Sequence, residues 1–459
     1  MSAHNNQLFK GLFKGFLKGS DTIKKAAAIG ATGLVLSACN TLEQLEVQSE
    51  EQSNIAESSV ISDKQVLETY VLLAQTQYQD ALFSASTLVT AVDAFLATPN
   101  NDTHNLAKQA WIDARAPYQQ TEVYRFGNAA VDDWEGKVNA WPLDEGMIDY
   151  VDAGYGSESD ENPFYTANII ANSTLTIGGE IVDASTINKA LLSTTLHEID
   201  EVESNVATGY HVIEFLLWGQ DLNGTNPGAG NRPASDYSLS HCTNGNCDRR
   251  RDYLKSASEL LVDDLKDINT SWNQGGAAQF ELESKGNKGG LATILTGMGS
   301  LAYGELAGER IKLGLMLHDP EEEHDCFSDN THWSHYYDAK GIKNVYLGEY
   351  ERTNGVRVFG ASLSDLVKAL NPELDAEMRT KLKTTEVAMQ VMVDQAAQGN
   401  TFDVLIGEGN TQGNQVIQNI VDALVTQTKT TAKIVSLLKL DGIELEGSDS
   451  LDNPSVIGT

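Results

Sequence analysis

The stretch KQVLETYVLLAQTQYQDALFSASTLVTAVDAFLA, residues 64–97, decides the fold class of this 459-residue chain. Its apolar residues recur every three or four positions, which is the period of one buried face of an α-helix. Thr98 and Pro99 end the pattern, as expected at a helix terminus. The same period predicts further helices at 102–126, 185–205, 206–218, 248–272, 291–317, 363–370, 372–398 and 412–440. We therefore predict an all-α fold of two halves, each resembling a four-helix bundle.

Long segments without the helical period separate some of these helices. They cover residues 127–184, 219–246 and 319–351, and loops of that length in a compact domain usually carry function. The predicted organisation is a signal peptide over 1–38, a flexible tether over 39–62, a first bundle half over 63–275, a second half over 286–445 and a C-terminal tail over 446–459.

The N-terminus is typical of an export signal rather than of a folded domain. Five lysines precede an apolar run at 26–38, which is too short to span a bilayer. The sequence LSAC at 36–39 resembles a bacterial lipobox, so we expect cleavage before Cys39 and lipid on its thiol. An ordinary signal peptide with an incidental cysteine is the alternative. Asn40 resembles an outer-membrane address, which predicts a lipid-anchored protein facing the periplasm.

Charge and cysteine content narrow the class of partner. The chain has 65 acidic and 32 basic residues, for a formal net charge of -33. Such a surface repels phosphate backbones, which excludes nucleic acid as a partner. It suits attraction of cations, solubility or salty surroundings equally. Cys242 and Cys247 lie in a turn-rich loop and predict a disulfide in an oxidising compartment, which leaves Cys326 as the remaining thiol.

The segment GYHVIEFLLWGQD, residues 209–221, is the best candidate for a functional motif. His211 and Glu214 are three residues apart on a predicted helix, so both side chains project from one face. Imidazole and carboxylate together suit iron, manganese or zinc. A histidine–glutamate hydrogen bond on a solvated face explains the pattern equally well, although the surrounding residues are apolar.

Two further stretches combine histidine with carboxylates. HEIDE at 197–201 is one histidine short of the zinc-protease motif His-Glu-x-x-His. His197 is therefore a secondary ligand candidate, and an exposed acidic helix is the favoured interpretation. Residues 318–335 hold four of the nine histidines. We favour a functional loop there over a solvated acidic one, with His324 and Asp329 as candidates.

Several motifs together resemble the imelysin family, which includes an insulin-cleaving membrane protease and the iron-regulated protein A group. The motif Gly-x-His-x-x-Glu with the following FLLWGQD carries the resemblance. It is supported by ARAPYQQTE at 114–122, RFG at 125–127, VNAWPLD at 138–144 and NRPASDY at 231–237. The resemblance spans about residues 64–440. It implies an all-α fold with the motif near the junction of two halves, a bacterial envelope location and a role in iron acquisition.

The resemblance makes His211 and Glu214 the leading metal ligands. Glu122 and Asp144 are the predicted additional carboxylates, while Arg125 and Asp221 are secondary candidates. The predicted function is an envelope-anchored protein that binds iron, or else zinc, and supports iron uptake or homeostasis with an iron-transport system as partner.

Two other functions remain open. One is a metallopeptidase with Glu214 as the catalytic base, although a catalytic zinc usually takes three protein ligands. The other is a receptor for a metal chelate or a partner protein, in which Arg125 and Arg232 matter more than His211.

Overall fold

The computed structural model describes residues 61–157, 159, 162–177 and 180–457. Residues 59–459 form one compact unit. The predicted signal peptide, Cys39 and all but the last two residues of the predicted tether lie outside the described residues. The described part is all-α, as predicted, with only two short antiparallel hairpins.

The helices of the part of the chain before residue 272 are α1 (Asp63–Ala97), α2 (Asn101–Gln119), η1 (Glu122–Tyr124), α3 (Ala129–Asn139), α4 (Glu145–Ile148), η2 (Ala153–Tyr155), η3 (Leu191–Leu196), η4 (Ile199–Glu201), α5 (Tyr210–Trp218), η5 (Ala234–Tyr237) and α6 (Cys247–Ser271). The later helices are α7 (Ala277–Ser284), α8 (Gly286–Ser300), η6 (Leu301–Lys312), α9 (Leu313–Leu317), η7 (Pro320–Glu322), α10 (Thr331–Leu347), α11 (Leu363–Leu370), α12 (Pro372–Ala396), α13 (Phe402–Ile406), α14 (Thr411–Leu438), α15 (Asp449–Asp452) and η8 (Pro454–Val456). The hairpins pair β1 (Thr174–Ile177) with β2 (Glu180–Asp183), and β3 (Glu349–Glu351) with β4 (Arg357–Phe359).

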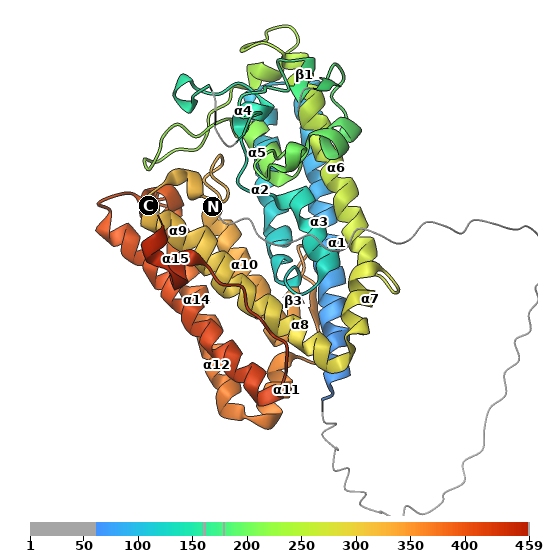
Figure 1. The fold of residues 1–459 in the computed structure, drawn as a ribbon, viewed down its shortest axis with the longest axis vertical. Helices are drawn as coiled ribbons and strands as arrows, with labels where there is room; N and C mark the ends of the chain where they lie inside the picture. The colour runs from blue at the N-terminus through green and yellow to red at the C-terminus, as the bar shows by residue number, and fades with distance from the viewer. Residues whose placement is uncertain (1–60, 158, 160–161, 178–179, 458–459) are drawn as a thin grey trace, which may run out of the picture. The chain divides into compact units, whose positions relative to one another are not determined.

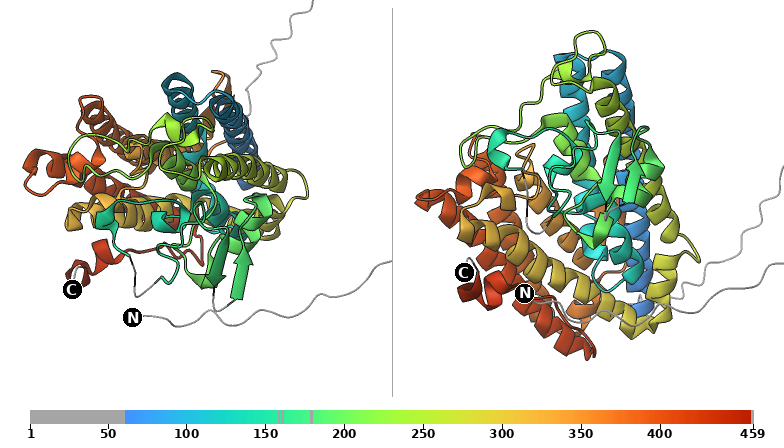
Figure 2. Two further views of the ribbon diagram at one scale, coloured as in Figure 1. Left: turned by 90° about the horizontal axis from the view of Figure 1, so that it is seen from above. Right: turned by 45° about the horizontal axis from the view of Figure 1, so that its top comes forward.

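A first group of helices forms around α1, which contacts α2 and α6 along its length (Figure 1). The Ser62 hydroxyl caps α1 by accepting a hydrogen bond from the backbone amide of Gln65, and the side-chain oxygen of Gln65 accepts one from the backbone amide of Ser62. Both bonds satisfy backbone amides that have no partner within the first turn of the helix. Helix α5 packs on α2 and α6. Helix α1 is long and apolar enough to cross a membrane by length and composition, but its apolar side chains here belong to the shared core. Figure 2 shows the β1–β2 hairpin at the edge of this group.

The second group contains α8, η6, α10, α11, α12 and α14. Helices α12 and α14 lie side by side, and α14 also contacts η6 (Figure 1). Asn371 caps α12 and Pro372 occupies its first turn, where the missing amide of proline does no harm. Helix α10 contacts both α12 and α2, so it joins the two groups. One continuous apolar core runs through both groups.

Glycines permit the closest approach between the groups. A Cβ on Gly341 of α10 would lie 2.5 Å from the carbonyl oxygen of Gln120, and one on Gly297 of α8 would overlap that of Val123. No larger side chain fits at either position without moving the backbone of Gln120, which follows α2, or of Val123, which lies in η1.

The secondary-structure prediction was wrong in four places. Residues 331–347, predicted to be loop, form α10, and residues 129–139 form α3. The predicted α-helix at 185–205 is two short helical turns instead, because Glu198 and Asp200 adopt left-handed backbone conformations that end any regular helix. Helix α2 starts from a cap at Asn100 and ends at Gln119 rather than running to 126.

Candidate metal centre

The Gly-x-His-x-x-Glu motif builds a helix that is buried on all sides. Every residue of α5 is buried. Gly209 precedes it with a φ of +92°, and a Cβ there would lie 2.6 Å from the carbonyl oxygen of Val138, so glycine is required for α5 to begin against the end of α3. The side chains of His211 and Glu214 are both fully buried. A solvated histidine–glutamate pair is therefore excluded.

Glu214 holds the His211 ring in place. Its Oε2 lies 3.2 Å from His211 Nδ1. Its Oε1 accepts hydrogen bonds from the amide and hydroxyl of Ser328, at 3.0 and 2.6 Å. Burial and the charge of Asp325 raise the pKa of Glu214 well above its usual value. With Nδ1 engaged, Nε2 of His211 has no hydrogen-bond partner among the described residues.

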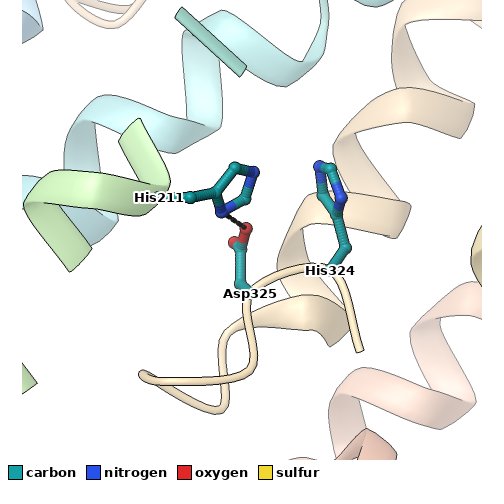
Figure 3. Close-up of side chains that lie close together, drawn as sticks. All are labelled: His211, His324 and Asp325. Atoms are coloured by element: carbon teal, nitrogen blue, oxygen red, sulfur yellow. Dashed lines mark ion pairs between the residues drawn. The ribbon is translucent and has the colours of Figure 1, made fainter. Parts of the chain in front are cut away.

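His324 and Asp325 complete a cluster with His211. The two imidazole centroids are 4.7 Å apart. The three side chains offer ligand atoms within 4.8 Å of one another, and His324 Nε2 also lacks a hydrogen-bond partner in the described part of the chain. Figure 3 shows His211 on its helix facing the other two residues on the loop that precedes α10. The loop predicted to be functional therefore meets the motif helix.

Asp325 is fixed by Arg115 of α2. Arg115 Nη2 donates to Asp325 Oδ1 at 2.7 Å, and both side chains are buried. Arg115 also donates to Asn139 at 2.7 Å, while Asn330 and Ser334 donate to the other carboxylate oxygen. Burial alone would raise the pKa of Asp325, but Arg115 outweighs it and holds that pKa at about 2. Asp325 is thus a buried, ionised ligand candidate.

Both histidines of the cluster are neutral at physiological pH. Burial lowers the pKa of His211 well below 6.5, and the charge of Arg115 adds to the effect. Burial and the charge of Arg310 do the same to the pKa of His324. Neutral imidazole is the form that binds metal ions. When Nδ1–H of His211 donates to Glu214, its lone pair is on the unpartnered Nε2.

A cavity of about 640 Å³ gives access to the cluster. His324 and Trp141 form part of its wall, and the Trp141 ring also packs against His211 with centroids 5.0 Å apart. The cavity is lined by six glutamates, Glu135, Glu198, Glu203, Glu305, Glu309 and Glu322, and by two arginines, Arg125 and Arg310. Its charge favours entry of a cation.

Comparison with known protein families identifies a match over most of the chain. The sequence model of the imelysin family matches residues 74–431. This chain belongs to the imelysin family. No curated protein matches it.

Two solved structures share the imelysin fold with it. One, described as an iron-regulated protein A precursor from Parabacteroides distasonis ATCC 8503, is 19% identical with a TM-score of 0.58; the match covers 83% of this chain and 97% of that one. The other, an imelysin-like protein from Psychrobacter arcticum 273-4, is 16% identical with a TM-score of 0.54 and the same two coverages.

Other predicted site residues of this imelysin-family chain lie outside the cluster. Glu122 accepts from Arg310 at 2.9 Å. Arg125 pairs with Asp132 at 2.8 Å. Arg310 also reaches Asp338, and Glu305 contacts both Arg310 and Arg125. This ionic network lies where η1, η6 and α10 meet.

Asp144 and His197 also have other partners. Asp144 accepts from Ser204 at 2.7 Å and from Asn162. His197 lies 3.9 Å from Glu198 and accepts weakly from the amide of Ala207.

Asp221 and Asp329 meet in a second cluster. Together with Asp403 they offer ligand atoms within 4.8 Å of one another. The sequence prediction named the first two and missed Asp403. Asp325 and Arg115 were also missed as site residues. The signal for Asp325 was its place beside His324, and the signal for Arg115 was its place in the quoted ARAPYQQTE motif.

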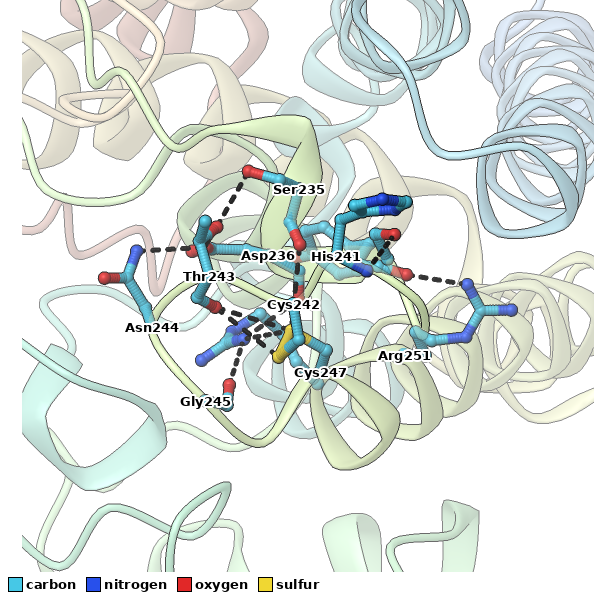
Figure 4. Close-up of a disulfide and its surroundings, with 12 residues drawn as sticks. Ser235, Asp236, His241, Cys242, Thr243, Asn244, Gly245, Cys247 and Arg251 are labelled. Atoms are coloured by element: carbon cyan, nitrogen blue, oxygen red, sulfur yellow. Dashed lines mark hydrogen bonds between the residues drawn. A yellow bond between two sulfur atoms is a disulfide. The ribbon is translucent and has the colours of Figure 1, made fainter.

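The structure joins Cys242 and Cys247 in a disulfide at the start of α6 (Figure 4). The hydroxyl of Thr243 and the amide of Asn244 donate to Asp236, which ties this loop to η5. Cys326 is a buried free thiol, and burial raises its pKa well above the usual value. It is therefore a protonated thiol next in sequence to Asp325 of the cluster.

Proposed function

We propose that this imelysin-family protein binds iron as its cargo at His211, His324 and Asp325. The observation that supports the proposal best is the pair of buried Nε2 atoms without hydrogen-bond partners, on His211 and His324. A buried polar atom left without a partner is costly. Both rings belong to a cluster that contains the ionised carboxylate of Asp325, whose Oδ1 lies 3.8 Å from Nδ1 of His211. A bound cation satisfies all three side chains.

The donor set favours ferrous iron. Two imidazoles and one carboxylate are the set used by many non-haem Fe(II) sites, and zinc accepts the same ligands. The Trp141 ring packs against His211 and His324, and Phe327 packs on Trp141, so aromatic rings cover part of the cluster. A relative of the same fold is described as iron-regulated. This supports iron over zinc as the physiological cargo.

Glu214 acts on the cargo through His211. Its carboxylate orients the imidazole, and Ser328 fixes the carboxylate in turn. Residues that orient a ligand in this way change metal affinity without touching the metal. Arg115 plays the corresponding role for Asp325.

The test is anaerobic titration of the purified full-length protein with Fe(II), in which isothermal calorimetry measures binding. We expect near-stoichiometric binding that is abolished in His211→Ala and His324→Ala. His241→Ala is the matched control, because His241 lies in an exposed loop and should leave binding unchanged. Absence of binding in the parent, or unchanged binding in both cluster variants, contradicts the proposal.

The cellular part of the proposal is a lipid anchor on Cys39 at the outer membrane, with the body in the periplasm and delivery of iron to a transport system. Substitution Cys39→Ser should move the protein from the membrane fraction to the soluble periplasmic fraction. Membrane association that survives this substitution contradicts the anchor.

A metallopeptidase remains the second candidate because the structure supplies a third ligand. His211, His324 and Asp325 together reach the number of protein ligands that a catalytic zinc uses. Glu214, however, is occupied by Ser328 and His211. Peptide cleavage that a chelator stops and that Glu214→Gln abolishes would support this candidate.

A further inference from the structure

Three acidic side chains from distant parts of the chain converge at a second position. Asp221 follows α5, Asp329 precedes α10 and Asp403 lies in α13. Each offers an oxygen within 4.8 Å of the other two. The tertiary fold brings together residues that are at least 74 positions apart in the sequence, so the cluster is not a local acidic run.

No positive side chain compensates these carboxylates. Among the described residues, none of the three has a lysine, arginine or histidine within ion-pair distance. Asp325, only four residues before Asp329, has Arg115 at 2.7 Å. Like charges gathered in a partly buried position repel one another and lose hydration.

The carboxylate of Asp403 is the strongest sign of a missing partner. Asp403 is fully buried, and neither of its oxygens has a hydrogen-bond partner of normal geometry in the described chain. Its ligand oxygen belongs to the cluster, so the side chain is directed at the other two carboxylates. A buried carboxylate without donors calls for an ordered water or a bound ion.

We propose that Asp221, Asp329 and Asp403 bind a calcium ion. An all-carboxylate set suits a hard cation rather than one that prefers nitrogen. Three carboxylates from separate parts of the chain suit calcium, which accepts several oxygen ligands in flexible geometry, whereas magnesium is usually bound through only one or two carboxylates. Asp221 is only partly buried, which leaves a side open for water ligands.

The calcium site would fix the loop that carries the iron ligands. Asp329 lies in the same loop as His324 and Asp325, and Ser328 of that loop donates to Glu214. Neighbouring residues of one loop therefore belong to two different clusters. Calcium bound on one side of the loop would hold His324 and Asp325 in place on the other side.

The experiment is thermal unfolding of the full-length protein after treatment with EDTA, in the absence and in the presence of about 1 mM calcium chloride. We expect the midpoint to rise by about 3–5 °C in calcium, and by less in magnesium. Asp403→Asn should abolish the shift. Glu408→Gln, an exposed acidic residue five positions away, should retain it.

Two further variants make the outcomes decisive. Asp221→Asn, at the partly exposed position, should reduce the shift and serves if Asp403→Asn does not fold. His211→Ala should retain the full calcium shift, which separates this site from the proposed iron site. No shift in the parent, an equal shift in Asp403→Asn and Asp221→Asn, or stabilisation by acid but not by calcium overturns the proposal. An equal magnesium shift overturns the choice of calcium.

Discussion

Two clusters of side chains share the loop between η7 and α10, and they differ in how their charge is balanced. His211, His324 and Asp325 contain one ionised carboxylate, and Arg115 neutralises it at 2.7 Å. Asp221, Asp329 and Asp403 contain three carboxylates and no basic partner among the described residues. The first cluster can persist in the folded protein without an ion. The second needs either a cation or protons.

Because of this difference, a bound metal ion would affect the stability of the protein differently in each cluster. In the first cluster the protein has prepared neutral imidazoles and a fixed carboxylate, so an ion can enter and leave without a large change in stability. That suits a transported cargo. In the second cluster an ion relieves repulsion inside the fold, so binding contributes to stability. That suits a structural cation.

The largest effect on stability is expected for Arg115→Ala, because this substitution leaves the first cluster with an uncompensated charge like that of the second. A buried ion pair that loses one partner costs about 3–5 kcal/mol. Denaturant unfolding measures this loss. Arg357→Ala is the control, since its pair with Glu349 is exposed and should change stability by less than about 1 kcal/mol. Equal effects of the two substitutions would contradict the role assigned to Arg115.

A structural histidine provides the next contrast. His104 is buried like His211 and His324, but its Nε2 lies 2.8 Å from the Leu217 carbonyl oxygen and its ring stacks on Phe95. Burial and the charge of Lys108 lower the pKa of His104 to about 4. The unfolded chain therefore binds the proton first as pH falls.

Stability should accordingly decrease as pH falls from about 6.5 to 4, by about 3 kcal/mol from His104 alone. His104→Gln should remove this part of the acid sensitivity and leave Fe(II) affinity unchanged. Unfolding measured at several pH values, with iron titration beside it, tests both parts. A loss of iron binding in His104→Gln would mean that the two kinds of buried histidine are not distinct.

The sequence predicted a helix well where the buried face of that helix is mainly apolar. Helices α11, α12 and α14 were predicted to within a few residues, because most of their buried positions are apolar and recur at the helical period. Helix α10 was missed for the opposite reason. Its buried positions include Thr331, Ser334, His335 and Asp338, which have the right spacing but the wrong polarity for a hydrophobic pattern.

The candidate site shows the same limit. Spacing on one helix was enough to nominate His211 and Glu214, and histidine density nominated His324. Asp325 gains its role from Arg115, which lies 210 residues earlier in the chain. Asp403 is a lone acidic residue in FDVLI. Neither partnership leaves a local signal, because each depends on how distant segments pack.

Glu214→Gln tests whether the first cluster depends on an oriented imidazole. The amide keeps the size of the carboxylate but changes the group that faces His211 Nδ1. Fe(II) affinity should fall by about 10–100-fold, less than on loss of His211 itself. Anaerobic calorimetry measures the change, with Glu283→Gln, an exposed glutamate on α7, as the control. An unchanged affinity would show that Glu214 does not orient the ligand.

The smallest expected effect concerns the route to the first cluster. Glu198 and Glu203 line the cavity beside His324, and their charges should attract a cation before it reaches the ligands. Replacing both with glutamine should slow Fe(II) association by about threefold at low salt, with dissociation unchanged, because neither side chain belongs to the ligand cluster. Stopped-flow measurement at low and at high salt tests this, since screening removes long-range attraction. The difference between parent and variant should therefore vanish at high salt. A difference that persists there, or that appears in dissociation, would place the two glutamates in contact with the bound ion and make the first cluster more like the second.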